Sequence, residues 1–281
     1  MELTLGVTLA VLGAGLLHAG WNALLKSAGG GDPLLDTATI VTGGTVCSLV
    51  VLPFVPLPLA ASWPFAFASA VVHLGYNLTL AQAYRTGDLS FAYPLMRGTA
   101  PLLVTLLGVV FLRELPPAQV MLGILLISAG IVGIAFAQRH HHPRAAVYWA
   151  LGNAVIIAVY TLIDGAGVRV AGNALSYVVW LSFIDGIIFL AWVRIGRGTG
   201  AMTYISVQWR RGLLGGFCSV AAYAIVLWAM TRAPVAAVAA LRETSVLFAA
   251  IIGTVLLKEG FGIARLIGAA SVVAGVAALK L

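Results

Sequence analysis

The chain has 281 residues, of which 61% are hydrophobic and 9% are charged, and its formal net charge is +7 at pH 7. Soluble domains carry about 25% charged residues, so this composition excludes a soluble globular protein and predicts an integral membrane protein. The basic residues lie singly or in pairs between apolar segments. That pattern is typical of topology signals and lipid headgroup contacts, and we expect no nucleic-acid partner.

Ten apolar segments follow one another along the chain, and each is close to the roughly 20 residues that a membrane-spanning helix needs. Short loops rich in Gly, Pro, Asn or Asp separate them. The segments span residues 3–25, 34–54, 63–84, 89–112, 117–137, 145–168, 174–194, 208–231, 234–257 and 261–280. We therefore predict an all-α membrane protein with ten transmembrane helices.

The first and third segments share a polar pattern, in which a histidine is followed by an aromatic residue at i+3 and an asparagine at i+4. This spacing puts all three side chains on one helical face. In lipid, such a face turns toward protein or water, so it predicts either a cavity wall or interhelical hydrogen bonds that only hold helices together. The residues are His18, Trp21, Asn22, His73, Tyr76 and Asn77.

The sixth to eighth segments add further polar residues. Tyr160 and Asp164 lie one turn apart in the sixth segment, and Tyr223 lies in the eighth. Asp164 has two interpretations, a cavity residue or a partner of Arg169 near the helix end. Asp185 lies in the middle of the seventh segment, where an unpaired acid is costly, and the sequence names no partner for it.

The fourth and ninth segments contain the most deeply placed charges, Arg97, Arg242 and Glu243. Tyr93 lies one turn before Arg97, and Pro101 leaves the Arg97 carbonyl without its helical donor. Successive residues of a helix point about 100° apart. We therefore expect Glu243 to face another helix rather than Arg242. Two interpretations stay open, a static Arg97–Glu243 pair and a pair that opens to bind substrate.

The region 97–130 recurs as 242–275 with the same spacing. Arg97 aligns with Arg242 and Glu114 with Glu259. Three glycine pairs also align, Gly108 with Gly253, Gly123 with Gly268, and Gly130 with Gly275. The recurrence predicts two copies of a five-helix unit, residues 1–138 and 145–281, joined by the linker 139–144. Because five is odd, the copies would cross the membrane in opposite directions as an inverted repeat.

The helix count, the duplication and the repeated Gly-x5-Glu-x8-Gly-x6-Gly signature resemble the EamA-type branch of the drug/metabolite transporter superfamily. The resemblance implies a central cavity lined by helices 1, 3, 4, 6, 8 and 9, and a structural role for Glu114 and Glu259. It also implies cytoplasmic termini, whereas the loop charges favour termini outside, so the orientation stays open. Members of the superfamily transport amino acids, amines, sugars and other metabolites.

We therefore predict a secondary transporter of a small polar metabolite, either an amino acid or a related zwitterion or organic ion, working by alternating access. The residues expected to bind substrate are His18, Trp21, Asn22, His73, Tyr76, Asn77, Tyr93, Arg97, Tyr160, Asp164, Tyr223, Arg242 and Glu243. Proton coupling through a histidine or Glu243 and facilitated diffusion both fit. The alternatives are an intramembrane enzyme using histidine and acid chemistry, and a helper subunit that transports nothing.

We expect this transporter in the bacterial inner membrane, in contact with membrane lipids, as a monomer or a homodimer. We expect no catalytic residues, no cofactor and no metal. The run His140-His141-His142 is interpreted as part of a solvated linker, because no other ligands are placed to complete a metal site.

Overall fold

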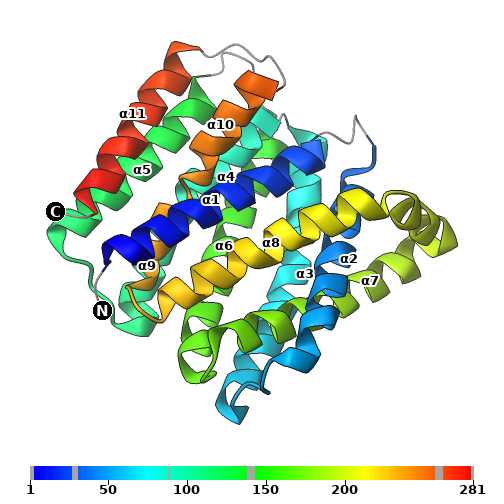
Figure 1. Cartoon of the computed structure of the whole chain (residues 1–281). Coiled ribbons are helices and arrows are strands. Elements are labelled where there is room, and N and C mark those ends of the chain that lie inside the picture. The colour runs from blue at the N-terminus through cyan, green and yellow to red at the C-terminus, as the bar shows by residue number, and fades with distance from the viewer. Residues whose placement is uncertain (1–2, 27–30, 88, 138–142, 257–261, 280–281) are drawn as a thin grey trace.

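The computed structural model describes residues 3–26, 31–87, 89–137, 143–256 and 262–279, and over these residues every element is a helix (Figure 1). Lys258, Glu259 and His140-His141-His142 lie outside the described residues. The elements are α1 (Leu5–Lys26), α2 (Pro33–Val51), η1 (Leu52–Phe54), η2 (Ala60–Ser62), α3 (Trp63–Thr86), α4 (Leu89–Leu107), η3 (Gly108–Leu112), α5 (Ala118–Phe136), α6 (Arg144–Val170), α7 (Ala174–Val207), α8 (Trp209–Met230), α9 (Val235–Arg242), α10 (Ser245–Leu256) and α11 (Ile263–Ala278).

Seven of the described helical spans are long and apolar enough to cross a membrane. The all-α prediction is confirmed, and these spans support a multi-pass membrane protein. Three expected segments fall outside the seven. Polar residues such as His73 and Asn77 make α3 less apolar than the seven spans. The ninth segment is split into two shorter helices, and α11 has 16 residues. The number of ten spans therefore stays a prediction.

The structure departs from regular helix at two places inside or between the expected segments, at Glu243 and Thr244 and at Gly198. The expected single helix 234–257 is instead two helices, α9 and α10, with a tight turn at Glu243 and Thr244 between them. The N–H groups of Glu243 and Thr244 bond to carbonyls three residues back, at 3.0 and 3.2 Å. In α7, Gly198 adopts φ 71°, a conformation that favours glycine. The sequence predicted a loop between the segments 174–194 and 208–231, whereas the structure interrupts the helix only at Gly198 and continues it to Val207.

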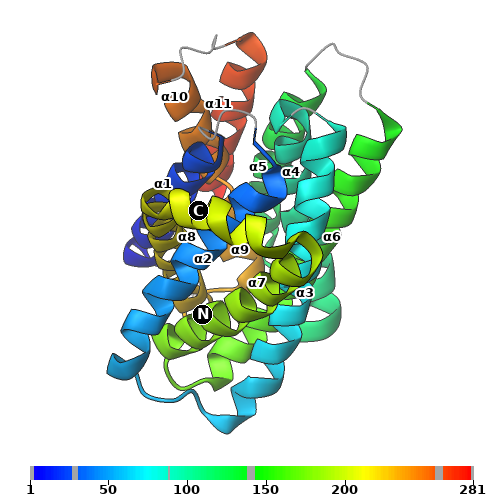
Figure 2. The same cartoon turned by 90° about the vertical axis from the view of Figure 1, so that its right-hand side faces the viewer.

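The helices pack lengthwise, and several pairs come from opposite halves of the chain (Figures 1 and 2). α1 packs along α8, α3 along α6, and α5 along α11. Glycines let α5 and α11 touch closely. A Cβ on Gly123 would lie 2.8 Å from the Gly275 oxygen, and one on Gly130 would lie 2.8 Å from the Gly268 oxygen. The reversed order of these partners means that α5 and α11 cross antiparallel.

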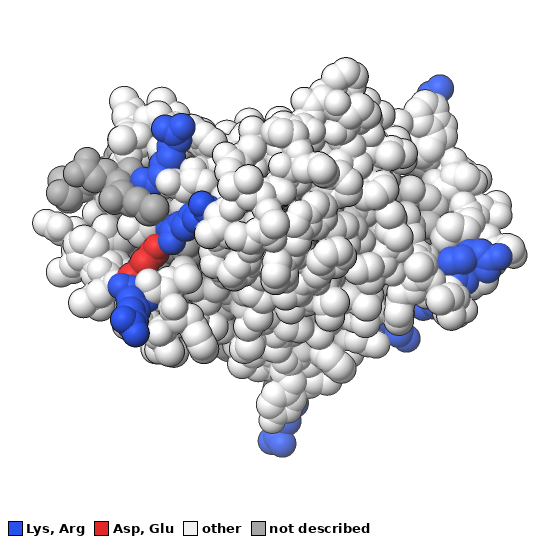
Figure 3. Space-filling view, turned by 90° about the horizontal axis from the view of Figure 1, so that it is seen from below, with Lys and Arg blue, Asp and Glu red and all other residues white. Residues whose placement is uncertain are grey.

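Large apolar side chains are exposed on the outside of the bundle. Phe54 is 84% exposed, Phe111 72% and Leu266 59%. Figure 3 shows one face on which basic side chains lie toward the periphery, around a broad uncharged area. Exposed large apolar side chains such as these suit contact with lipid.

Candidate functional site

A cavity of about 140 Å³ lies among the helices, lined by residues of α1, α2, α3, α6, α7 and α8 and by the end of α9. It brings together eight of the residues expected to bind substrate. These are His18, Trp21, His73, Tyr76, Asn77, Tyr160, Tyr223 and Arg242. None of the residues that line this cavity belongs to α4, which was expected to contribute. Thr37 of α2 and Asp185 of α7 take part instead.

Aromatic rings form one wall of the cavity. The His73 ring stacks on Tyr160, with centroids 4.3 Å apart, and meets Tyr223 edge to face at 6.0 Å. Tyr76 meets Tyr160 edge to face at 5.6 Å. Such a wall offers ring faces on which a cationic group can lie. The spacing of His73 and Tyr76 in α3 already placed both on one face, while only the packing of α6 against α3 and α8 assembled the wall.

The matching pattern in α1 is used differently. The Trp21 Nε1–H donates to His18 Nδ1 at 3.2 Å, which holds both rings at the cavity wall. The Asn22 amide donates to the His18 carbonyl at 2.8 Å, within its own helix. Asn22 is not among the residues that line this cavity. Asn77, its counterpart in α3, is buried and lines the cavity.

Glu243 lies between two arginines, and all three side chains are buried. The Arg97 Nε atom lies 2.5 Å from Glu243 Oε2, and the Arg242 Nε atom lies 3.4 Å from Glu243 Oε1. Glu243 faces another helix as expected, through Arg97 of α4, but the expectation that it does not contact Arg242 is wrong. Only Arg242 of the three lines the cavity, and Arg97 and Glu243 lie behind it.

Two other expected site residues also lie outside the cavity wall. Tyr93 is half-buried and packs against the hydrophobic core one turn before Arg97. Asp164 is fully buried and accepts hydrogen bonds from the hydroxyls of Tyr177, at 3.0 Å, and Tyr223. The proposed pairing of Asp164 with Arg169 is wrong.

Arg169 binds Glu114 instead. Its Nη1 donates to Glu114 Oε1 at 2.5 Å, and its Nε donates to the Met230 carbonyl at 2.9 Å. Glu114 Oε2 accepts the N–H of Val235, the first residue of α9, at 3.0 Å. The glutamate of the signature therefore joins the end of the fourth helix to α6 and α9, and this structural role agrees with the one that the resemblance implied.

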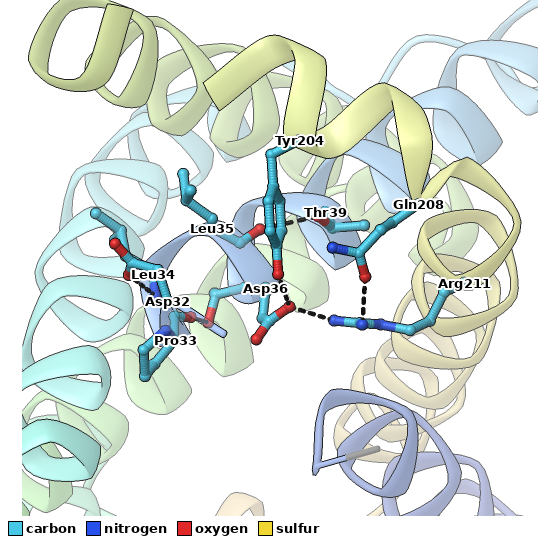
Figure 4. A network of polar contacts seen from close by, with 10 residues as sticks. Asp32, Pro33, Leu34, Leu35, Asp36, Thr39, Tyr204, Gln208 and Arg211 are labelled. Carbon is cyan, nitrogen blue, oxygen red and sulfur yellow. Dashed lines mark hydrogen bonds and ion pairs between the residues drawn. The ribbon is translucent and has the colours of Figure 1, made fainter. Parts of the chain in front are cut away.

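Sequence reasoning missed a partly buried polar network at the end of the bundle where α2 begins (Figure 4). Asp36 Oδ1 accepts from the Tyr204 hydroxyl at 2.8 Å and from Arg211 Nη2 at 2.5 Å, while Arg211 Nη1 also donates to Gln208. The network joins α2, the segment of α7 beyond Gly198, and α8. Asp36 adjoins Thr37, which lines the cavity. In the sequence, Asp36 looks like an ordinary acid in the first turn of a helix.

Comparisons with known proteins agree with this architecture. The model of the EamA-like transporter family matches residues 144–281. One of the solved structures that match is a crystal structure of a protein, with a TM-score of 0.75 and 19% sequence identity to this chain. The match covers 97% of this chain and 96% of that one, and at this identity it shows the fold alone. No curated protein matches.

Proposed function

We propose that this chain, whose residues 144–281 match the EamA-like transporter family, is a secondary transporter of a small polar metabolite, an amino acid or a related zwitterion or organic ion. The observation that carries the proposal is a cavity among apolar helices that is lined by polar, charged and aromatic side chains. It holds a guanidinium, a carboxylate, two histidines and an aromatic wall. Arginine suits a carboxylate or a similar anion, and an acid with aromatic rings suits an amine.

The binding residues in this proposal are those that line the cavity. His18, Trp21, Asn77 and Arg242 would surround the solute together with the aromatic wall of His73, Tyr76, Tyr160 and Tyr223. Arg97, Glu243 and Asp164 would act from behind, because they hold Arg242 and Tyr223 in place. Asn22 and Tyr93 would support the first and fourth helices.

The solute would cross by alternating access between two inverted five-helix repeats. The packing supports this arrangement, because exchanging the two halves turns the α1–α8 contact into the α6–α3 contact, and both occur. The α5–α11 contact maps onto itself, since Gly123 corresponds to Gly268 and Gly130 to Gly275. Two helices related by an axis in the membrane plane must run antiparallel, as α5 and α11 do.

The inverted repeat predicts that the loop after η3 and the start of α11 face opposite sides of the membrane. In a chain whose Cys47 and Cys218 are replaced by serine, single cysteines at Leu115 and Gly262 should react with a membrane-impermeant maleimide from opposite sides. Intact and inverted vesicles provide the measurement. Labelling of both positions from the same side would contradict the inverted repeat.

The Asp36 network would close one end of the cavity in this mechanism. It ties the segment beyond Gly198 to α2, next to the cavity residue Thr37. A buried ion pair that forms in one conformation and breaks in the other biases the equilibrium between them. Opening this end would require Asp36 to release Tyr204 and Arg211.

Replacing Asp36 by asparagine should therefore favour the conformation that is open at this end. In the background without native cysteines, a cysteine at Thr37 should react several-fold faster with an impermeant thiol reagent in the Asp36→Asn variant. Thr37 is 5% exposed in this structure, so a low starting rate is expected. Unchanged reactivity together with a lower melting temperature would identify the network as a static link between helices.

Purified protein in liposomes tests the proposed function itself. Vesicles loaded with a metabolite mixture should take up the matching labelled solute by counterflow without changing it, and a pH gradient across the same vesicles shows whether protons are coupled. Chemical conversion of a solute would favour the intramembrane enzyme. If no solute is either transported or converted, the helper subunit is favoured.

A further inference from the structure

Two opposite charges in the cavity have unused hydrogen-bonding atoms. Asp185 Oδ1 and Arg242 Nη2 are both buried, and neither has a hydrogen-bond partner. Among the described residues that line the cavity, Asp185 carries the one carboxylate and Arg242 the one guanidinium. A buried polar atom without a partner is uncommon in a folded protein, and its presence calls for an explanation such as a ligand.

The other acids near the cavity are already engaged. Glu243 lies between Arg97 and Arg242, and Asp164 accepts the hydroxyls of Tyr177 and Tyr223. Both acids lie behind the cavity wall, so neither offers a solute the access that Asp185 offers. Asp185 lies in the middle of α7, where an unpaired carboxylate costs about 2.5–3.5 kcal/mol on membrane-insertion scales.

We propose that Asp185 binds the cationic group of a small zwitterion whose anionic group binds Arg242 Nη2. This assignment rests on the proposed transport function and names the residues that select the substrate. A zwitterion satisfies both unused atoms at once, whereas an amine alone leaves Arg242 Nη2 without a partner and an anion alone leaves Asp185 Oδ1 without one. The ring faces of the aromatic wall add a second surface for the ammonium group.

The size of the cavity also favours a small solute. Its volume of about 140 Å³ is below the roughly 300 Å³ at which pockets for drug-sized ligands begin. Ser182 of α7 and Ser219 of α8 also line the cavity, and their hydroxyls can serve either end of the solute. Small amino acids, with both charges on a short carbon chain, are therefore the class expected to fit.

The test compares wild-type protein with Asp185→Asn in detergent and in liposomes. Glycine, L-alanine, β-alanine and L-serine are the probes. Each is compared with the amine that lacks its carboxylate and the acid that lacks its ammonium group, which for L-alanine are ethylamine and propionate. Thermal stabilisation and counterflow are measured. We expect wild type to respond to at least one zwitterion and to neither of its partial analogues.

Asp185→Asn should weaken the affinity for that zwitterion about 10- to 100-fold, as expected for loss of a hydrogen bond between charged groups. It should melt no lower than wild type, because removing an unpaired buried charge relieves its cost. Asp185→Glu, which keeps the charge, should retain part of the response. Asp32→Asn is the matched control, since Asp32 pairs with Arg197 at the surface and asparagine also caps a helix.

Several results would overturn the assignment. For Asp185→Asn, these are an unchanged affinity, or a markedly lower melting temperature that accounts for the lost response. For wild type, they are an equal response to the amine or the acid alone, or no response to any zwitterion of the panel. In each case counterflow of another solute would leave the transport proposal standing. Absence of counterflow for every metabolite would contradict both.

Discussion

Glu243→Gln is expected to lower the free energy of unfolding more than any other single change in the charged cluster, by about 3–5 kcal/mol. Glu243 is fully buried between Arg97 and Arg242. Glutamine keeps the shape of the side chain but removes its charge, so both guanidiniums lose their counter-charge inside the bundle. Unfolding of the purified protein in detergent, by heat or by denaturant, measures the change.

Arg97→Gln should cost less than Glu243→Gln, because Glu243 then keeps Arg242 as its partner. The double variant should recover part of the lost stability, since it leaves one unpaired arginine instead of two. Transport by the double variant should stay low, because Arg242 has lost the carboxylate that orients it toward the cavity. Additive destabilisation would contradict the pairing, and full transport by the double variant would contradict the supporting role of the pair.

Gly43→Ala is expected to cost about 3 kcal/mol, at the upper end of what overpacking usually costs. A Cβ on Gly43 would lie 1.8 Å from the Gly212 oxygen and 2.2 Å from its carbonyl carbon. Both are backbone atoms of α8, so no side-chain rotation relieves the contact. The helices α2 and α8 must separate, which also disturbs the cavity that they help to line. A thermal melt together with counterflow measures both effects.

The adjacent glycine is the matched control for this change. A Cβ on Gly44 would meet the Val220 Cγ2 atom at 3.2 Å, and Val220 can shift slightly. Alanine also favours a helix over glycine by about 1 kcal/mol, so Gly44→Ala should leave stability nearly unchanged. Gly133→Ala in α5, where nothing lies within 4 Å, should be neutral or stabilising. Equal losses at Gly43 and Gly44 would show that the backbone contact is not the cause.

The residues of the site differ in whether helical spacing or packing between helices reveals their role. His73 and Tyr76 were found by helical spacing, and they do lie together at the cavity wall. Asp185 was recognised as costly in the middle of a helix, but a single residue carries no spacing from which a partner can be read. Asp36 resembled an acid that stabilises the start of a helix, and its contacts with Tyr204 and Arg211 join residues more than 160 positions apart in the chain.

The sequence by itself determined the membrane class and the approximate position of most helices, and the family resemblance implied the structural role of Glu114. These properties depend on local composition, on the length needed to cross a bilayer, and on residues such as Glu114 whose spacing recurs. Apolar length and turn residues act within a few positions along the chain, so they can be read without a fold.

Only the tertiary structure decided which polar residues share a cavity. Arg242 and Glu243 are adjacent in the sequence and contact each other in the structure, which helical spacing alone did not predict. The packing of α2 and α7 placed Thr37 and Asp185 in the cavity, and that of α4 left Arg97 behind it. The position of a buried charge depends on its partners on other helices. In an apolar environment, the free energy of a charge is set by the polar and charged groups that it contacts.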